Sequence, residues 1–184
     1  MKKIIALALS LMMLLGCVSA LAEAAEKEIL TVVGAFEIKY NPLPEYYTLD
    51  ADENTDLDYT ALILPQSEDK PMMILNIAFS DEWDGVNTLA DATEEDIAAV
   101  KADFYEEAEL NEGDLSFTDM ETAHGTPVLV VREIDGTLAS VYTIYLSHEI
   151  EIVLFGSDDA PITDADVDAV LAFLSDVDFV PLEK

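Results

Sequence analysis

The sequence predicts an α+β fold: a single domain in which an antiparallel β-sheet carries two amphipathic helices. Several apolar runs of strand length are separated by short turn-forming connections, which is typical of hairpins. Two other segments have apolar residues at helical spacing, each preceded by a capping pattern. A hydrophobic fraction of 51% in 184 residues provides enough apolar surface for a core without a disulfide or a metal.

The first 22 residues have the layout of a secretory signal peptide. Lys2 and Lys3 precede an apolar stretch over residues 4–15, and small residues follow over 16–22. We therefore assign residues 1–22 to a signal peptide. The apolar stretch is shorter than the roughly 20 residues needed to cross a bilayer, so no membrane span is predicted.

Two cleavage sites compete. Residues 20–22 (Ala-Leu-Ala) suit ordinary signal peptidase and would leave Glu23 as the new N-terminus. Residues 14–17 (Leu-Leu-Gly-Cys) resemble the bacterial lipobox, in which Cys17 would be lipidated and would anchor the protein to the membrane. Because the residues after Cys17 are apolar rather than a polar tether, we favour release. Both outcomes place the domain outside the cytoplasm.

The charge balance excludes one large class of partners. The chain has 39 Asp and Glu against 8 Lys and Arg, a net charge of −31. Loss of Lys2 and Lys3 with the signal peptide would leave −33. Such a field repels phosphate backbones, so nucleic-acid binding is not expected. A single cysteine, Cys17, also excludes an intramolecular disulfide and a zinc site built on several cysteines.

After the signal peptide we expect an N-terminal segment over residues 23–34 and one α+β domain over 35–184. Its first strand is predicted over Phe36–Tyr40, where apolar and charged residues alternate. Pro42 ends that strand.

A hairpin is predicted next. Tyr59–Leu64 and Met72–Phe79 are apolar runs of strand length, and residues 65–71 between them are rich in turn formers. The two runs should therefore pair antiparallel.

The first helix is predicted from Thr93 to about Glu109. Thr93 can cap it, and Asp96, three residues on, completes a capping box. Four apolar residues recur at helical spacing and form a narrow stripe: Ile97, Val100, Phe104 and Ala108.

A meander of four strands should follow, over residues 115–120, 128–134, 139–146 and 150–155. Asp135-Gly136 predicts a type I′ turn, in which both central residues have positive φ. Ser147–Glu149 is too short for anything except a tight antiparallel return.

The second helix is predicted after Pro161. Thr163 is its cap and Asp166 completes a second capping box. A stripe that should face the core follows at helical spacing: Val167, Val170, Leu171 and Leu174.

This order of elements resembles the PsbP-like superfamily, which includes the extrinsic photosystem subunit and exported bacterial DcrB-type proteins. The likeness is carried by residues 36–40 (FEIKY), 122–128 (TAHGTPV), 141–155 and 172–179 (AFLSDVDF). The resemblance implies an antiparallel α+β fold and an accessory or binding role rather than catalysis. The acidic run after the first strand departs from the family's short connector, so no ligand site is carried over.

The acidic run has the spacing of a calcium loop. Oxygen-bearing side chains fall at alternate positions, as hard cations require: Asp50, Asp52, Asn54, Asp56 and Asp58. Thr55 replaces the glycine of the sharp turn, and Ala61 replaces the bidentate glutamate. Because such spacing arises easily among 39 acids, we favour a solvated loop over a calcium site.

Four other residues are candidates for ligand binding or an interface. For His124 and His148 we favour exposed turn positions over catalysis. For Trp83 we favour a cap on the sheet edge over a ligand platform. Arg132, the only arginine, should pair with an acid on a neighbouring strand rather than bind an anion.

The sequence therefore predicts an exported, non-catalytic accessory or binding domain in a bacterial envelope or extracellular space. Its partner would be a protein, an envelope component or a small ligand, and no cofactor is expected. No catalytic residue is predicted, because no known hydrolase, metalloprotease or nucleotide-binding motif occurs. Two alternatives stay open: an extracytoplasmic, hydrolase-like enzyme with an unrecognised site, and a calcium-binding module.

Overall fold

The computed structural model describes residues 28–32, 36–41, 43–50, 55, 58–108, 110–111, 113–157 and 160–182. The predicted signal peptide, both cleavage sites and Cys17 lie outside the described residues.

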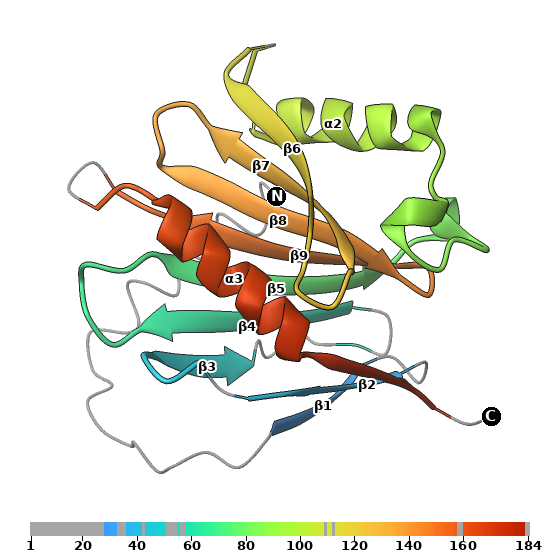
Figure 1. Ribbon diagram of the computed structural model, residues 1–184, viewed down its shortest axis with the longest axis horizontal. Helices are drawn as coiled ribbons and strands as arrows, with labels where there is room; N and C mark the ends of the chain where they lie inside the picture. The colour runs from blue at the N-terminus through green and yellow to red at the C-terminus, as the bar shows by residue number, and fades with distance from the viewer. Residues whose placement is uncertain are drawn as a thin grey trace.

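The described strands form two antiparallel sheets (Figure 1). The larger sheet has seven strands in the order β3-β4-β5-β9-β8-β7-β6. These are β3 (Tyr46–Asp50), β4 (Asp58–Pro65), β5 (Met72–Phe79), β6 (Leu115–Glu121), β7 (Pro127–Glu133), β8 (Leu138–Tyr145) and β9 (His148–Phe155). The smaller sheet has the order β1-β2-β10, with β1 (Glu28–Val32), β2 (Phe36–Tyr40) and β10 (Asp178–Pro181).

Two α-helices lie on opposite faces of the larger sheet. Helix α3 (Asp164–Asp176) crosses the sheet in front of β5, β8 and β9 in Figure 1, whereas α2 (Glu94–Ala108) lies beside β6 and β7. Two short 3-10 helices, η1 (Asp81–Trp83) and η2 (Leu89–Asp91), precede α2. The α+β class predicted from the sequence is confirmed.

Helix α3 covers the apolar face of the sheet. Its predicted stripe of Val167, Val170, Leu171 and Leu174 is buried in one cluster with Leu75, Ile152 and the β2 residues Phe36 and Ile38. The capping box predicted for Thr163 is present, with the Thr163 amide donating to Asp166 Oδ2 at 2.8 Å. The smaller sheet and α3 thus share one core with the larger sheet.

Helix α2 packs on the opposite face, over β6, β7 and β8. Val100 and Phe104 are buried against Leu129, Val131 and Ile144. The capping box predicted at the start of this helix is also present, because the Asp96 amide donates to Thr93 Oγ1 at 3.2 Å. Both predicted helices therefore begin where their caps indicate.

The small sheet is the main difference from the predicted order. β1 lies within the segment expected to precede the domain, and β2 pairs with β1 and β10 rather than joining the larger sheet. The strands β1, β3 and β10 are not predicted by the sequence, because they are four or five residues long and carry little alternation. Pairing with β2, or with β4 in the case of β3, makes them strands.

Two consecutive residues with positive φ occur in the β8–β9 turn and not in the β7–β8 turn, where the sequence predicts them. At the β7–β8 turn only Gly136 has positive φ, at 80°, and its amide donates to Glu133 O at 3.1 Å. The type I′ turn predicted at Asp135-Gly136 is therefore wrong, although the hairpin itself is confirmed. At the β8–β9 turn, Leu146 and Ser147 both have positive φ, of 48° and 63°.

The β8–β9 turn is held by a neighbouring segment. Leu146 N–H donates to Asn87 O and Ser147 N–H donates to Val86 O, each at 3.0 Å. Ser80 N–H donates in turn to Ser147 O at 3.2 Å. Left-handed backbone is unfavourable for a residue such as leucine, so these tertiary bonds are what allows the two-residue turn.

Candidate functional site

The acidic loop falls mostly outside the described residues, which include neither Asp52, Asn54 nor Asp56. Asp50 ends β3 and Asp58 begins β4, and the exposed Asp58 N–H donates to Thr55 Oγ1 at 3.0 Å. Calcium binding by this loop stays a prediction.

Trp83 is buried on the α2 face beside the inner strand β9, so the expectation that it caps a sheet edge is wrong. Only 4% of it is accessible, and its indole N–H donates to Glu149 Oε1 at 2.6 Å. Its ring belongs to the cluster around α2. Because the ring is covered and its one polar group is bonded, Trp83 fixes β9 to the segment before α2.

A row of polar groups crosses the same face beside that tryptophan. Asn76, Glu151 and Tyr142 are opposite one another on β5, β9 and β8. Ser140 donates its hydroxyl to Glu151 Oε1 at 2.7 Å, and Thr60 donates to Asn76 Oδ1 at 3.2 Å. These bonds satisfy the two hydroxyls and the oxygens that accept from them, whereas Asn76 Nδ2 is buried and has no hydrogen-bond partner among the described residues.

Tyr142 has the most perturbed acidity in this row. Burial raises the pKa of its phenol well above the usual range, and the nearby carboxylates of Glu149 and Glu151 raise that pKa further. Its hydroxyl is buried and makes no hydrogen bond of normal geometry within the described part of the chain. Tyr142 therefore stays protonated and neutral at physiological pH.

The two histidines differ in their surroundings. His124 is exposed in the β6–β7 turn, as expected. His148 is 2% accessible, so the expectation that it is exposed is wrong. Its ring packs edge-on against Phe36 and Phe79, and its Nδ1–H donates to Leu146 O at 2.7 Å. That bond requires the proton on Nδ1, because a carbonyl only accepts.

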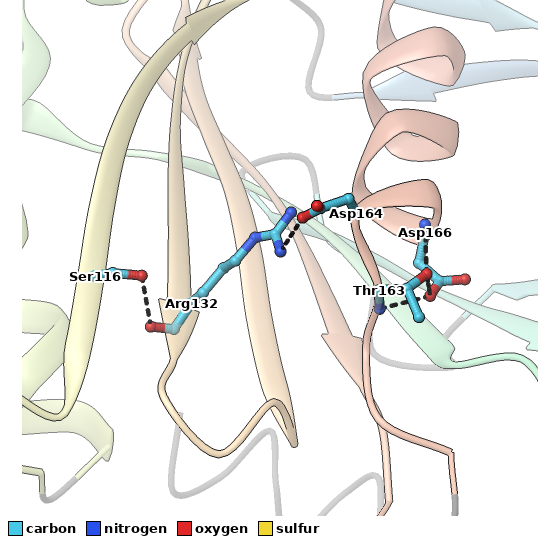
Figure 2. A network of polar contacts seen from close by, with 5 residues as sticks. All are labelled: Ser116, Arg132, Thr163, Asp164 and Asp166. Atoms are coloured by element: carbon cyan, nitrogen blue, oxygen red, sulfur yellow. Dashed lines mark hydrogen bonds and ion pairs between the residues drawn. The ribbon is translucent and has the colours of Figure 1, made fainter.

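Arg132 joins α3 to β7 (Figure 2). Its Nη1 lies 2.7 Å from Asp164 Oδ1, and its carbonyl accepts a hydrogen bond from the Ser116 hydroxyl at 3.3 Å. The acid that pairs with Arg132 is therefore in the first turn of α3 and not on a neighbouring strand. Because Asp164 is exposed, this ion pair positions the helix weakly.

Strand β6 is one edge of the larger sheet, and its bonding pattern can be read from both ends. Thr122 N–H donates to Thr126 O at 2.9 Å, and Ile134 N–H donates to Asp114 O at 3.0 Å. In an antiparallel ladder, bonded and non-bonded pairs alternate. The even-numbered residues of β6 therefore bond to β7, and the backbone groups of Phe117, Asp119 and Glu121 point away from it.

Helix α2 closes only part of that edge. The Tyr105 hydroxyl donates to Leu115 O at 3.4 Å, which occupies the first outward carbonyl. Farther along, an open groove of about 370 Å³ separates the start of α2 from β6. Glu94, Ile97 and Lys101 line it from the helix and Asp119 from the strand.

The sequence predicts β6 as a strand but does not show that it is an edge. Its alternation is weak, because Thr118, Asp119, Met120 and Glu121 are all exposed. Four consecutive exposed residues in a strand are a signal for an edge position, since an inner strand buries at least one face. The groove could not be found this way, because it is formed by residues from two separate elements.

Within the described ranges, no three or more His, Cys, Asp or Glu side chains are grouped so as to hold a metal ion. None of the helices among the described residues is both long and apolar enough to cross a membrane.

Comparisons with known proteins give one similar fold. The solution structure of cyanobacterial PsbP (CyanoP) from Synechocystis sp. PCC 6803 matches with a TM-score of 0.48 and 13% sequence identity. The match covers 89% of this chain and 98% of the cyanobacterial one. It is to a protein of the superfamily that the sequence resembles, and it concerns the arrangement of strands and helices alone. No protein-family model matches the chain, and no curated protein matches it in sequence.

Proposed function

We propose that the chain is an exported, non-catalytic accessory domain that binds a partner outside the cytoplasm. The observation that carries this proposal is the open edge of β6 beside the α2 groove. Exposed strand edges are sites at which other chains add, and soluble proteins usually block them with charged side chains, proline or a bulge. From Leu115 to Glu121, β6 contains no proline and no lysine, and its two charges, Asp119 and Glu121, repel acidic chains but not basic ones.

The export half of the proposal rests on the Lys2-Lys3 start, the apolar stretch and the small residues before Glu23. Intact mass of the protein recovered from a bacterial host tests it. A chain beginning at Glu23 in the medium or periplasm supports release. A species beginning at a diacylated Cys17 would move the protein to the membrane surface, and an uncleaved cytoplasmic chain would overturn export.

The binding half can be tested by photo-crosslinking in intact cells. A photoreactive amino acid replaces Met120 on β6, which is 37% accessible. The matched control replaces Tyr47 on β3, which is 42% accessible and lies on the opposite edge strand. We expect one discrete adduct from position 120 and none from position 47.

Equal adducts from both positions would indicate non-specific collision, and no adduct from either would contradict a binding role for β6. Purified protein is also assayed with generic ester and phosphoester substrates. Turnover that saturates with substrate would favour the alternative of an extracytoplasmic enzyme.

A further inference from the structure

We propose that β6 binds an extended, basic peptide segment as an additional antiparallel strand, with one basic side chain of that segment in the α2 groove. This inference rests on the binding role proposed above and names the mode and the partner's chemistry. It follows from the backbone groups at the edge, the residues of the groove and the charge around both.

The backbone provides the first requirement. The outward N–H and C=O groups of Phe117, Asp119 and Glu121 are spaced two residues apart, which is the repeat of one edge of a β-ladder. Within the described part of the chain no hydrogen bond occupies them. At about 3.3 Å per residue, the open stretch matches a partner segment of about five residues.

Side chains on both sides of the edge leave room for an added strand. Thr118 and Met120 are exposed on the α3 face, and Asp119 and Glu121 are exposed on the α2 face. Leu115 is buried and its carbonyl is taken by Tyr105, so the added strand must end before that residue. The start of β6 is thus blocked and its second half is open.

The groove determines which side chain fits beside Asp119. Ile97 and Ala98 line it with aliphatic side chains, and Glu94 and Asp119 line it with carboxylates. Lys101 also lines it, with its Nζ 5.6 Å from the centre of the Phe117 ring. A lysine or arginine matches this arrangement, because its stem can cover Ile97 while its cation meets the two carboxylates.

Charge decides against a second copy of the chain as the occupant. Two exported chains, each with a net charge of −33 after loss of Lys2 and Lys3, would have to approach each other, and antiparallel pairing of β6 with itself would bring Asp119 and Glu121 of both copies together. Like charges across a ladder are destabilising. A basic segment gains from the same field, which also raises its rate of encounter.

Amide hydrogen exchange measured by NMR on the exported protein tests the proposal. The probe is a seven-residue peptide of alternating lysine and valine, acetylated and amidated, at physiological ionic strength. In the free protein, Phe117, Asp119 and Glu121 amides should exchange fast and those of Thr118 and Met120 slowly, because only the latter bond to β7. Addition of the peptide should slow the three odd-numbered amides and leave the others unchanged.

A chemically matched peptide isolates the role of the backbone. Methylation of alternate amide nitrogens keeps every charge and side chain but removes the donors along one edge. If the peptide adds as a strand, this version should bind at least about tenfold more weakly, in line with losing hydrogen bonds worth about 1 kcal/mol each. Equal affinity of the two peptides would overturn strand addition.

Two variants at one position separate backbone from charge in the protein. Asp119→Asn keeps the outward N–H and removes one carboxylate of the groove, so it should weaken binding a few-fold at most. Asp119→Pro also removes the outward N–H, and it leaves the bonds to β7 intact because Asp119 is at a non-bonded position. We expect Asp119→Pro to bind about tenfold more weakly than Asp119→Asn.

The remaining outcomes each contradict the inference. Odd-numbered amides protected in the free chain at every concentration would mean that another segment of the chain already covers the edge. Protection that grows with protein concentration would indicate a second copy. Binding with the odd-numbered amides still exposed would place the peptide elsewhere. If a partner is still crosslinked from position 120 in the same preparation, the proposed binding role is supported and only the strand-addition mode is overturned.

Discussion

The two faces of the larger sheet are built from the same strands but differ in the residues that β9 contributes to them. On the α3 face, β9 contributes Ile150, Ile152 and Leu154 to a continuous apolar layer. On the α2 face the same strand contributes Glu149 and Glu151, each held by a hydrogen bond from a buried partner. One strand therefore supports a core on one side and a bonded polar row on the other, so at β9 one face depends on packing and the other on specific bonds.

The largest effect is expected on the α3 face. Leu171→Asp would place a charge in the apolar layer, because Leu171 is 8% accessible within the cluster. We expect a loss of about 3 kcal/mol or more in the free energy of unfolding, measured by urea denaturation. The control is Ala172→Asp on the exposed side of the same helix. Equal midpoints for the two variants would show that this face is not core.

A smaller effect is expected from the bond between Trp83 and Glu149. Trp83→Phe keeps most of the buried ring and removes the indole N–H that Glu149 accepts. A hydrogen bond to a charged group is worth about 2 kcal/mol, and we expect a loss of that order. A double-mutant cycle with Glu149→Ala, which removes the acceptor, isolates the pair. A coupling energy near zero would mean that ring packing alone holds this face.

The helix caps allow a direct comparison, because α2 and α3 start with the same Thr-x-x-Asp box. Thr93→Ala and Thr163→Ala should each remove about 1 kcal/mol from their helix, and serine at either position should restore it. Since α3 buries six residues, its loss should appear in global unfolding. The loss in α2 should appear partly as faster local amide exchange. Identical global effects would show that the two helices are equally coupled to the core.

Alkaline pH should distinguish the polar row from the rest of the molecule. The pKa of Tyr142 is raised above its ordinary value of 10.0 by burial first and by Glu149 next. As pH rises through that ordinary value, the unfolded chain loses this proton while the folded chain keeps it, so stability falls. At pH 7 the free energy of unfolding of Tyr142→Phe should equal that of the native protein, because the hydroxyl has no well-formed bond within the described residues.

Above pH 10 the Tyr142→Phe variant should lose less stability than the native protein. Tyr46 and Tyr145 also have raised pKa values and remain in both proteins, so the difference isolates Tyr142. Parallel stability curves would contradict a raised pKa for Tyr142 in the folded protein.

The smallest effect is expected from calcium, at the loop between β3 and β4. If the loop is solvated, calcium should raise the melting temperature only as much as sodium chloride of matched ionic strength. Replacing Asp50, Asp52 and Asn54 with serine should then leave the difference between the calcium and sodium chloride responses unchanged. A saturable calcium-specific rise that disappears in this triple variant would establish a site.

Local chemistry was enough to predict both helices from the sequence. Thr93 and Thr163 mark the helix starts because a threonine cap and an aspartate three residues later act within a single turn. The six strands of seven or eight residues were likewise visible as apolar runs, and the five-residue β2 as an apolar and charged alternation. The Asp135-Gly136 hairpin was predicted but its turn type was not, because Asp135 instead accepts from the Thr137 amide at 3.0 Å and only Gly136 becomes left-handed.

Three features depend on contacts between distant segments and were decided only by the tertiary structure: the β8–β9 turn, the burial of His148 and the edge position of β6. Leu146 and Ser147 adopt positive φ because the segment from Ser80 to Asn87 bonds to their backbone, and no local preference predicts this. His148 is buried because Phe36, more than a hundred residues earlier, packs on its ring. β6 is an edge because the chain returns to place β9 beside β5, which leaves β6 as the last strand of the meander. Alternation and caps act over a few residues, whereas sheet order, burial and edges are set by contacts between segments far apart in the chain.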